Sequence, residues 1–494
     1  MKRISLLKRL LEILASVQGL KPLLSTRSLC KFLPMSETRI ERDSMGEMPV
    51  PIEALYGAST QRAVLNFPVS HRPVDPLMVS AYGLIKLAAA NANGELGVID
   101  TEKAALIEKA AREVFEGQHD EHFPVDTYQT GSGTSTNMNA NEVIANRAKQ
   151  IAPDCGVHPN DHVNQGQSSN DTFPTAMHIA TGLALKDLLI PALENLHKSL
   201  AQKTHEFNDV LKIGRTHLMD ATPVRLGQEF GGFAKQVERS LDRAHKALKA
   251  LHELPLGGTA VGTGLNCDPA FPKKAIAIIA AETKIDFIEA ENHFEAQAAK
   301  DALVEAHGQL NTIATSLFKI ANDFRLLGSG PRCSIGEISL PATQPGSSIM
   351  PGKVNPVMAE AVTMVSARVF GNHSTVTWAG ANGHFELNVF MPVMIAAVLE
   401  SVRLLANVST IFDEKCVQGV VANKERCESL IENSLSMVTS LAPIIGYEPA
   451  SKIAKESVET GRTVRELCAE RLDELKISAE QLAAALDPAT MAGE

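Results

Sequence analysis

The chain has 494 residues, which is enough for two or three domains with a large buried core. Hydrophobic residues make up 44% and charged residues 21% of the sequence, as in an ordinary globular enzyme. The formal net charge of −10 argues against a surface that binds nucleic acid. If so acidic a chain binds an anion, it must do so with local hydrogen-bond donors rather than with its overall field.

Membrane-spanning and metal-binding classes are disfavoured as well. The sequence has no uninterrupted run of about 18 apolar residues, so we expect no membrane span. Its seven cysteines are scattered without a CxxC pair, which indicates neither a disulfide framework nor a zinc site. His158 and His162 are four residues apart, but Pro159 and Asn160 predict a turn there instead of a metal-binding helix face. We expect neither a metal nor a cofactor.

Residues 1–34 differ in composition from the rest of the chain. They carry seven Lys and Arg residues against the single acid Glu12, with frequent leucine and serine. This composition is typical of a targeting peptide, but it also fits a plain upstream extension, because Met35 opens a stretch that resembles a natural start. The extension is the favoured interpretation and predicts a cytoplasmic protein. A transit peptide would predict the mitochondrial matrix.

The region 35–167 is predicted to be an N-terminal mixed helical domain. Helical spacing with alanine-rich faces covers 79–94 and 101–116. A polar cluster at 130–141 then leads into a helix that we expect to begin near Asn137. A second polar cluster at 158–171 ends in Asn170, Asp171 and Thr172, which are typical of a helix start.

The region 168–424 is predicted to be a bundle of long helices, at about 174–209, 226–253, 294–327, 357–379 and 385–411. Within 294–327, apolar residues recur at spacings of three and four as an unbroken seam: Leu303, Ala306, Leu310, Ile313, Leu317, Ile320, Phe324 and Leu327. A similar seam in 226–253 favours near-parallel helices that cross at about 20°. After residue 424, proline and glycine interrupt shorter helices, so 425–494 reads as a small C-terminal helical domain. The fold class is therefore predicted to be all-α.

The segment 341–356 holds four prolines and two glycines, which excludes a helix interior or a central strand. Between them stand two hydroxyls (Ser347, Ser348), one lysine (Lys353) and one amide (Asn355). We expect a mobile loop that binds an anion and transfers a proton. Glycines before the serine pair and before the lysine allow the backbone to approach a bound molecule closely.

Four polar clusters interrupt the helical pattern, at 130–141, 158–171, 214–222 and 341–356. Any one of them is more often a loop than a site, but all are rich in hydroxyl, amide and basic donors and poor in carboxylates. Together they indicate a site that holds an anion by hydrogen bonds. His217 is either a capping or core histidine or a general acid and base, for which Glu360 is the candidate orienting carboxylate. The glycine-rich segment 257–266 lacks the order of a phosphate loop and predicts a tight turn that lines the pocket.

The sequence GSSIMPGKVNP at 346–356 resembles the signature of the fumarase/aspartase superfamily of lyases. The segments 129–148, 158–180, 212–224 and 254–266 are similar to class II fumarases, and the resemblance extends from about Met35 to the C-terminus. Aspartases typically have glutamine and alanine where this chain has His217 and Gly352. The resemblance therefore favours water over ammonia as the group that is added or removed.

The resemblance implies reversible, stereospecific hydration of fumarate to L-malate through a carbanion. It implies that Ser347 is the base and that His217, paired with Glu360, handles the proton of water. It further implies a set of residues that bind the substrate carboxylates: Ser132, Gly133, Thr134, Ser168, Ser169, Asn170, Thr216, Ser348, Lys353 and Asn355. A second dicarboxylate site is implied at His158, Pro159, Asn160 and Asp161. Before that site relatives often have a longer segment with a basic residue, where this chain has a short segment with Cys155.

The family's fold implies a three-domain subunit with a central five-helix bundle. Four such bundles would join into a twenty-helix tetramer, with each active site shared between subunits. Two other functions are kept open. One is an ammonia-lyase that acts on aspartate or a related amino acid, against which His217 argues. The other is a catalytically silent helical assembly, against which the intact serine, lysine, asparagine and histidine argue.

Overall fold

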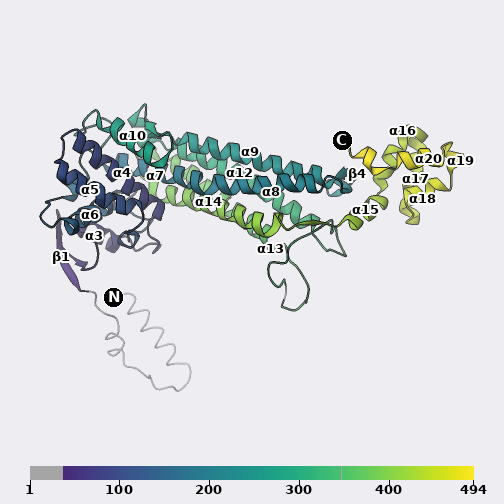
Figure 1. The fold of residues 1–494 in the computed structure, drawn as a ribbon, viewed down its shortest axis with the longest axis horizontal. Helices are drawn as coiled ribbons and strands as arrows, with labels where there is room; N and C mark the ends of the chain where they lie inside the picture. Colours follow the sequence, from purple (N-terminus) through teal and green to yellow (C-terminus); the bar gives the residue numbers. More distant parts are fainter. Residues whose placement is uncertain (1–36, 347, 494) are drawn as a thin grey trace, which may run out of the picture.

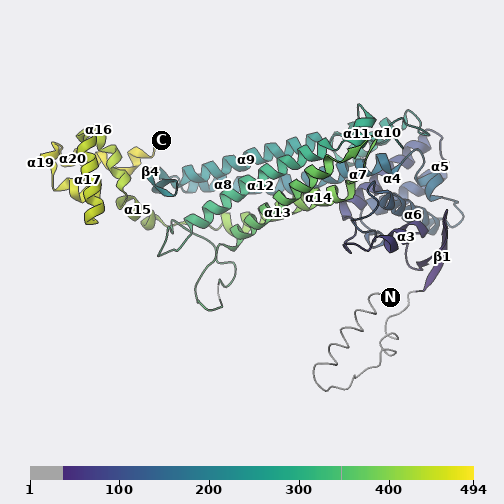
Figure 2. The ribbon, with the colours of Figure 1, turned by 180° about the vertical axis from the view of Figure 1, so that it is seen from behind.

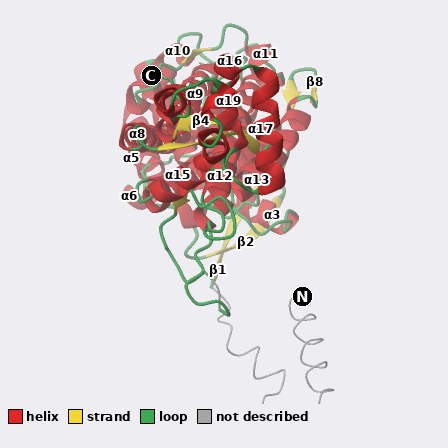
Figure 3. Ribbon diagram, turned by 90° about the vertical axis from the view of Figure 1, so that its right-hand side faces the viewer, coloured by secondary structure: helices red, strands yellow, loops and turns green. Residues whose placement is uncertain are grey.

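The computed structural model describes residues 37–346 and 348–493, and most of this chain is helical. Figure 1 shows an elongated molecule with a helical lobe at the N-terminal end, long central rods and a small lobe at the C-terminal end. The strands form only two-stranded ladders, and Figure 3, viewed along the rods, shows how little of the fold they make up. The all-α fold class is confirmed.

The N-terminal lobe packs four helices behind one hairpin. The hairpin is β1 (Thr38–Asp43) with β2 (Gly46–Pro51), and the helices are α3 (Ala58–Asn66), α4 (Pro76–Glu95), α5 (Thr101–Phe115) and α6 (Thr134–Ile151). A short 3₁₀ turn at Asp120–His122 precedes α6. Two of these helices follow the predicted spans closely. Helix α6 begins ahead of the expected Asn137, because Gly133 stands at its N-cap with φ 73°.

Five long helical rods form the central bundle. The first is α7 (Ser169–Ala184), which continues through a π turn (Leu185–Leu189) into α8 (Ile190–Glu206). The others are α9 (Leu226–Ala250), α12 (Asp301–Leu327), α13 (Val357–Gly380) and α14 (Met391–Phe412). Every residue of the predicted seam in α12 is buried, so the predicted five-helix bundle is confirmed. Phe324 joins three rods, with its ring centroid 5.3 Å from Phe230 of α9 and 5.1 Å from Phe412 of α14.

Three predicted elements differ from the structure. The expected helix 294–327 is divided into α11 (His293–Ala298) and α12, with the buried Lys300 at the break. The expected helix 385–411 begins only at Met391, because β8 (Gly383–His384) and β9 (Leu387–Asn388) form a hairpin before it. The residues Pro159–Val163 form one π-helical turn where a simple turn was predicted.

The polar stretch 214–222 lies in a hairpin of β3 (Leu211–Thr216) and β4 (Met219–Arg225). Between α9 and α12 in the sequence come β5 (Glu253–Leu254), paired with β6 (Ile288–Glu289), and α10 (Phe271–Thr283), which packs against α4 in the N-terminal lobe. Beyond α14 the chain passes through a π turn (Asp413–Val417) to β10 (Val421–Ala422), which pairs with β7 (Ile338–Ser339).

The C-terminal lobe has an apolar cluster of its own, formed mainly by residues from Ile431 onward. Its elements are short: α15 (Lys424–Glu432), a 3₁₀ turn (Leu435–Ser440), α16 (Ala442–Ile445), α17 (Tyr447–Thr460), α18 (Val464–Ala469), α19 (Leu472–Leu475), α20 (Ala479–Ala485) and α21 (Pro488–Met491). The Gln228 side chain of α9 donates a hydrogen bond to the Ala492 carbonyl at 2.8 Å, which fastens the chain end to the bundle.

Two stretches are long and apolar enough to cross a membrane by length and hydropathy alone, Ser169–Glu206 and Met391–Val417. Their most apolar windows are 72% and 67% buried inside the protein. Both belong to the bundle, and core helices of a globular protein have this composition because they are covered on several sides. Burial therefore accounts for their hydropathy.

The rods separate two groups of loops. Helix α12 has 27 residues and is therefore about 40 Å long at 1.5 Å per residue. The N-terminal ends of α6 and α7 lie next to the N-terminal lobe, whereas the β3–β4 hairpin and the loop before α13 lie at the opposite end (Figures 1 and 2). The predicted site residues are divided between these two ends.

Candidate active site

The first group of site residues is a cluster of hydroxyls where α6 and α7 begin. The Thr134 Oγ1 atom lies 2.7 Å from Ser169 Oγ and 3.0 Å from Ser132 Oγ. Ser132 and Ser169 are buried, so the hydroxyls meet in a partly enclosed place. Helix N-termini attract anions through their free amides and their dipoles. The structure thus brings hydroxyl donors from two helix starts to one point, as expected for a carboxylate-binding site.

Two glycines allow this cluster to form. Gly133 has a left-handed φ of 73°, and a Cβ atom there would lie 1.9 Å from the Phe173 ring. A Cβ atom on Gly131 would lie 1.9 Å from the carbonyl oxygen of Val389, which follows the β8–β9 hairpin. Any side chain at either place would push the hydroxyls away from α7 or from the hairpin. The glycines of the TGSGT segment are therefore required by close packing.

The start of α7 is fixed by a capping box. The Ser168 hydroxyl accepts a hydrogen bond from the Asn170 amide, and Asp171 Oδ1 accepts one from the Ser168 amide at 2.9 Å. Asp171 Oδ2 accepts from the amides of Gly257 and Thr259, both at 3.0 Å. Burial raises the pKa of Asp171, and the backbone donors oppose that shift. This carboxylate faces backbone donors, so it does not repel an anion at the hydroxyl cluster directly.

The glycine-rich segment 257–266 is a tight turn held against α7. The Gly262 amide donates to the Gly258 carbonyl at 2.9 Å, and the Asn170 side chain donates to the Ala260 carbonyl at 2.8 Å. Asn170 is thus anchored by its amide nitrogen. Its second N–H and the Ser168 hydroxyl proton are the donors left to act on an anionic ligand.

The second group lies at the far end of the bundle, where His217 stands at the tip of the β3–β4 hairpin. Thr216 pairs with Met219, so His217 and Leu218 form a two-residue turn with φ 57° and 61°. This left-handed backbone suits glycine and asparagine and is strained for histidine and leucine. Strain of this kind is often kept at functional sites, where it aims a side chain. The His217 side chain is exposed and thus free to meet a ligand or a second chain.

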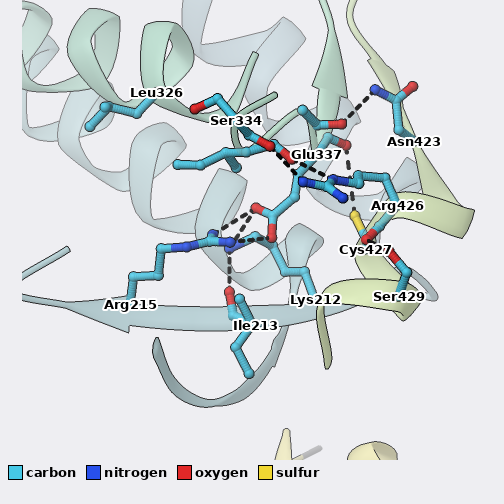
Figure 4. Close-up of polar contacts among 12 residues, drawn as sticks. Lys212, Ile213, Arg215, Leu326, Ser334, Glu337, Asn423, Arg426, Cys427 and Ser429 are labelled. Atoms are coloured by element: carbon cyan, nitrogen blue, oxygen red, sulfur yellow. Dashed lines mark hydrogen bonds and ion pairs between the residues drawn. The ribbon is translucent and has the colours of Figure 1, made fainter. Parts of the chain in front are cut away.

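A buried charge cluster holds the base of this hairpin (Figure 4). Both nitrogens of the Arg215 fork donate to the Glu337 carboxylate at 2.9 Å, and Lys212 Nζ lies 3.3 Å from the same carboxylate. The Glu337 side chain is completely buried and that of Lys212 is 1% exposed. Across the cluster, Arg426 donates to the carbonyls of Ser334 and Ile335. The cluster ties the hairpin that bears His217 to the chain just before the loop 341–356.

The loop 341–356 forms neither helix nor strand over its described residues, and Ser347 lies outside them. Ser348 and Lys353 are exposed. The Asn355 side chain donates to the Gly346 carbonyl, and a Cβ on Gly346 would overlap the Lys353 carbonyl oxygen, so the two ends of the serine-lysine segment touch. This closure places Ser348 and Lys353 on one small loop at the hairpin end of the bundle.

Glu360 lies in the first turn of α13 and is half-buried. In the described part of one chain, Glu360 makes no hydrogen bond or ion pair with His217. The pairing of these two groups therefore stays a prediction. The same holds for the meeting of Thr216, His217 and the loop with the hydroxyl cluster, because the rods hold the two groups apart within one chain.

The residues of the predicted second site lie on the exposed π turn Pro159–Val163. His158 Nδ1 lies 3.1 Å from Asp161 Oδ2. The Lys103 ammonium of α5 lies 3.1 Å from His162 Nε2, so a basic group does approach this turn from another helix. Burial, followed by the charge of Lys103, lowers the pKa of His162. The role of this turn as a second dicarboxylate site remains untested.

Sequence reasoning missed the buried polar groups that support the site. Lys86 was not recognised, although a single lysine in the apolar stretch GLIKLAAA was a usable signal. Glu337 was not recognised either, and its isolated acid between two apolar neighbours is a weaker signal. Neither residue lies in a polar cluster of the sequence.

Comparisons with known proteins agree with this picture. Residues 46–371 match the family model described as lyase, and residues 437–493 match the model described as the fumarase C C-terminus. The class II fumarate hydratase of Corynebacterium glutamicum is 53% identical over 464 residues, covering 93% of this chain and 98% of the relative. The mitochondrial fumarate hydratase of Rattus norvegicus is 53% identical over 451 residues, covering 88% and 89%.

A solved structure agrees in fold over nearly the same length. The class II fumarase of Schistosoma mansoni superposes with a TM-score of 0.88 at 40% identity, covering 92% of this chain and 99% of that one. The chain belongs to the lyase family of the class II fumarate hydratases.

Proposed function

We propose that this protein hydrates fumarate to L-malate, reversibly and stereospecifically, as a hydro-lyase of the tricarboxylic acid cycle that needs no cofactor. The observation that carries the proposal is the identity of 53% to fumarate hydratases over nearly the whole chain. The hydroxyl cluster at α6 and α7 supports it, because such donors suit a small dicarboxylate. At position 217 this chain has histidine, as class II fumarases do, where aspartases typically have glutamine. His217 therefore supports water as the added group.

When L-malate is the substrate, the Ser347 alkoxide takes the proton from C3 of malate. The electron pair left on C3 spreads into the adjacent carboxylate, and the C2 hydroxyl then leaves as water with a proton delivered from the His217 side. Lys353, Ser348 and Asn355 donate to the negative charge as it develops. The cluster of Ser132, Gly133, Thr134, Ser168, Ser169 and Asn170 holds the other carboxylate, and Thr216 adds a donor beside His217. This division of roles follows the resemblance residue by residue.

The chemistry is tested by mixing the purified protein with L-malate and following ultraviolet absorbance, since the alkene of fumarate absorbs and malate does not. Absence of turnover in both directions would exclude the proposed function and revive a silent assembly. Release of ammonia from L-aspartate would instead favour the ammonia-lyase.

Replacement of Lys353 by methionine is expected to lower kcat/KM by about 10²–10³-fold, the usual cost of removing one donor to a developing oxyanion. Methionine keeps the length of the side chain without its charge, and the exposed position makes folding insensitive to the change. Lys452→Met is the matched control, because Lys452 is an exposed lysine of α17 in the C-terminal lobe. Equal rates for the two variants would remove Lys353 from the site.

We infer further that the protein works as a homotetramer with active sites shared between subunits. The two groups of site residues lie at opposite ends of rods that are about 40 Å long, so one chain alone cannot close the site around a small dicarboxylate. Helix α13 supports assembly as well, because it is apolar on most of its circumference. On its outer face Met364 is 67%, Phe370 38% and Trp378 61% exposed. Such a helix is normally covered by another chain.

The assembly predicts a sedimentation mass of four times 53.0 kDa. Trp378→Glu would bury a charge at the interface between subunits, which is costly. It should therefore shift the protein from tetramers to dimers or monomers and reduce turnover at the same time. Val458→Glu introduces the same charge at an exposed apolar position of the C-terminal lobe, 66% exposed, and should change neither quantity. A monomer with full turnover would contradict shared sites.

We propose the cytoplasm as the compartment. Residues 1–34, on which the alternative of the mitochondrial matrix depends, lie outside the described residues. The matching relatives include one from Corynebacterium glutamicum, whose name gives no compartment, and one from Rattus norvegicus that is named as mitochondrial. Fractionation of cells that make the native chain tests this proposal.

A further inference from the structure

Lys86 of α4 is a fully buried lysine without a carboxylate partner in the described chain. Its Nζ donates to Asn137 Oδ1 at 2.9 Å, to Asn164 Oδ1 at 3.1 Å and to Gln167 Oε1 at 2.9 Å. An ammonium has three donors, and each of these has an acceptor here. The lysine is thus completely hydrogen-bonded, but entirely to neutral side-chain amides.

Holding a charge in this place is costly. Burial lowers the pKa of Lys86 to about 7, and only the charge of Asp171 opposes the shift. A methionine would fill the same space without that cost, because buried charges are in general no more stabilising than apolar residues of similar volume. A contribution to global stability therefore does not account for a lysine at position 86.

Two of the three acceptors adjoin the helix starts that carry the hydroxyl cluster, and the third, Asn164, ends the π turn just before α7. Asn137 lies one turn after Thr134 in α6, and its Oδ1 also accepts from Thr172 Oγ1 in the first turn of α7 at 3.3 Å. Gln167 directly precedes Ser168. Asn164 Oδ1 also accepts from the side-chain nitrogens of Asn137 at 3.0 Å and Asn141 at 3.1 Å. One ammonium therefore joins the first turn of α6 to the residues that lead into α7.

The charge also fixes how these amides point. A side-chain amide can rotate to exchange its oxygen and nitrogen, but an ammonium accepts only oxygen as a neighbour. With Lys86 charged, the oxygens of Asn137, Asn164 and Gln167 must face it. The Asn137 nitrogen then reaches Asn164, and the Asn164 nitrogen donates to the Gln167 carbonyl at 3.1 Å. A neutral residue at position 86 removes this constraint, although the Gln167 nitrogen still donates to the carbonyls of Val163 and Gln165.

We propose that Lys86 is a positioning residue for the substrate carboxylate, because its ammonium sets the spacing of the two helix starts at which Ser132, Thr134 and Ser169 converge. The inference rests on the proposed hydration of fumarate. Lys86 touches no hydroxyl of the cluster, and it acts through Asn137 and Gln167.

The test is Lys86→Met, assayed with fumarate and with L-malate. We expect KM to rise at least tenfold with a much smaller change in kcat, since the cluster holds a carboxylate in the ground state and transition state alike. Lys300→Met is the matched control. Lys300 is 2% exposed, and its ammonium donates to three backbone carbonyls, those of Ala296, Gln297 and Ala299, away from the helix starts. The thermal stability of Lys300→Met should change to a similar degree as that of Lys86→Met, and its KM should stay within twofold of the wild type.

A second pair of variants covers the case in which Lys86→Met does not fold. Asn164→Leu removes one acceptor of the ammonium and three neighbouring hydrogen bonds, and should raise KM severalfold. Asn164→Asp retains the acceptor for the ammonium but loses the donor to the Gln167 carbonyl, so it should raise KM less than Asn164→Leu does. Folded Lys86→Met with KM within twofold of the wild type would overturn the proposal, as would an equal rise of KM in Lys300→Met. Absence of turnover in the wild type would instead show that the proposed function is wrong.

Discussion

Replacement of His217 by asparagine is expected to lower kcat by about 10²–10⁴-fold, the range in which general acid and base catalysis contributes. Asparagine is chosen for the backbone, because His217 holds φ 57° and asparagine tolerates this left-handed region better than most residues. The hairpin should therefore fold at least as well as in the wild type. Any loss of turnover then reports on the imidazole. Steady-state kinetics and circular dichroism measure the two effects separately.

The control is Leu218→Asn at the neighbouring position of the same turn. Leu218 has φ 61° and is 73% exposed, so asparagine should relieve the same kind of strain without removing an acid or base. Turnover close to that of the wild type is expected. A His217→Asn enzyme with wild-type kcat would show that the histidine is at the turn tip for some other reason.

Replacement of Glu337 by glutamine is expected to lower the free energy of unfolding by about 3–5 kcal/mol, because it leaves buried cations without their counter-charge. Lys212 loses a carboxylate at 3.3 Å, and Arg215 loses a two-pronged partner at 2.9 Å. The Lys212 Nζ atom also lies 3.3 Å from Glu229 Oε2, and this second carboxylate limits the decrease in the free energy of unfolding. Urea denaturation gives the change in free energy. Because the cluster joins the hairpin to the segment before the loop, turnover should fall as well.

Glu432→Gln is the matched control for this change. Its partner Arg465 lies 3.1 Å away, but both side chains are about two-fifths exposed, at 42% and 41%. Ion pairs in contact with water contribute at most about 1 kcal/mol, so little change is expected. In addition, Lys212→Met combined with Glu337→Gln should recover part of the lost stability. Equal effects of the two glutamine variants would contradict a special role for the buried acid.

The helices were predictable because their signal is local. Leu303, Leu310, Leu317 and Phe324 mark one face of a helix by spacing alone, and the structure buries that face. Breaks were harder to place. The hairpin before Met391 and the interruption at Lys300 depend on side-chain hydrogen bonds to nearby backbone carbonyls, which hydropathy patterns do not contain.

The sequence by itself determined the all-α class, the long rods and the family, because periodicity and short motifs are properties of neighbouring residues. It also selected the hydroxyl cluster, whose members adjoin helix starts. Only the tertiary structure decided that Arg215 meets Glu337, 122 residues away, and that Lys86 reaches Gln167, 81 residues away. Buried charges acquire their partners through the packing of whole helices, so no local sequence pattern predicts which residues these partners are. The same packing separated the two halves of the site to opposite ends of rigid rods.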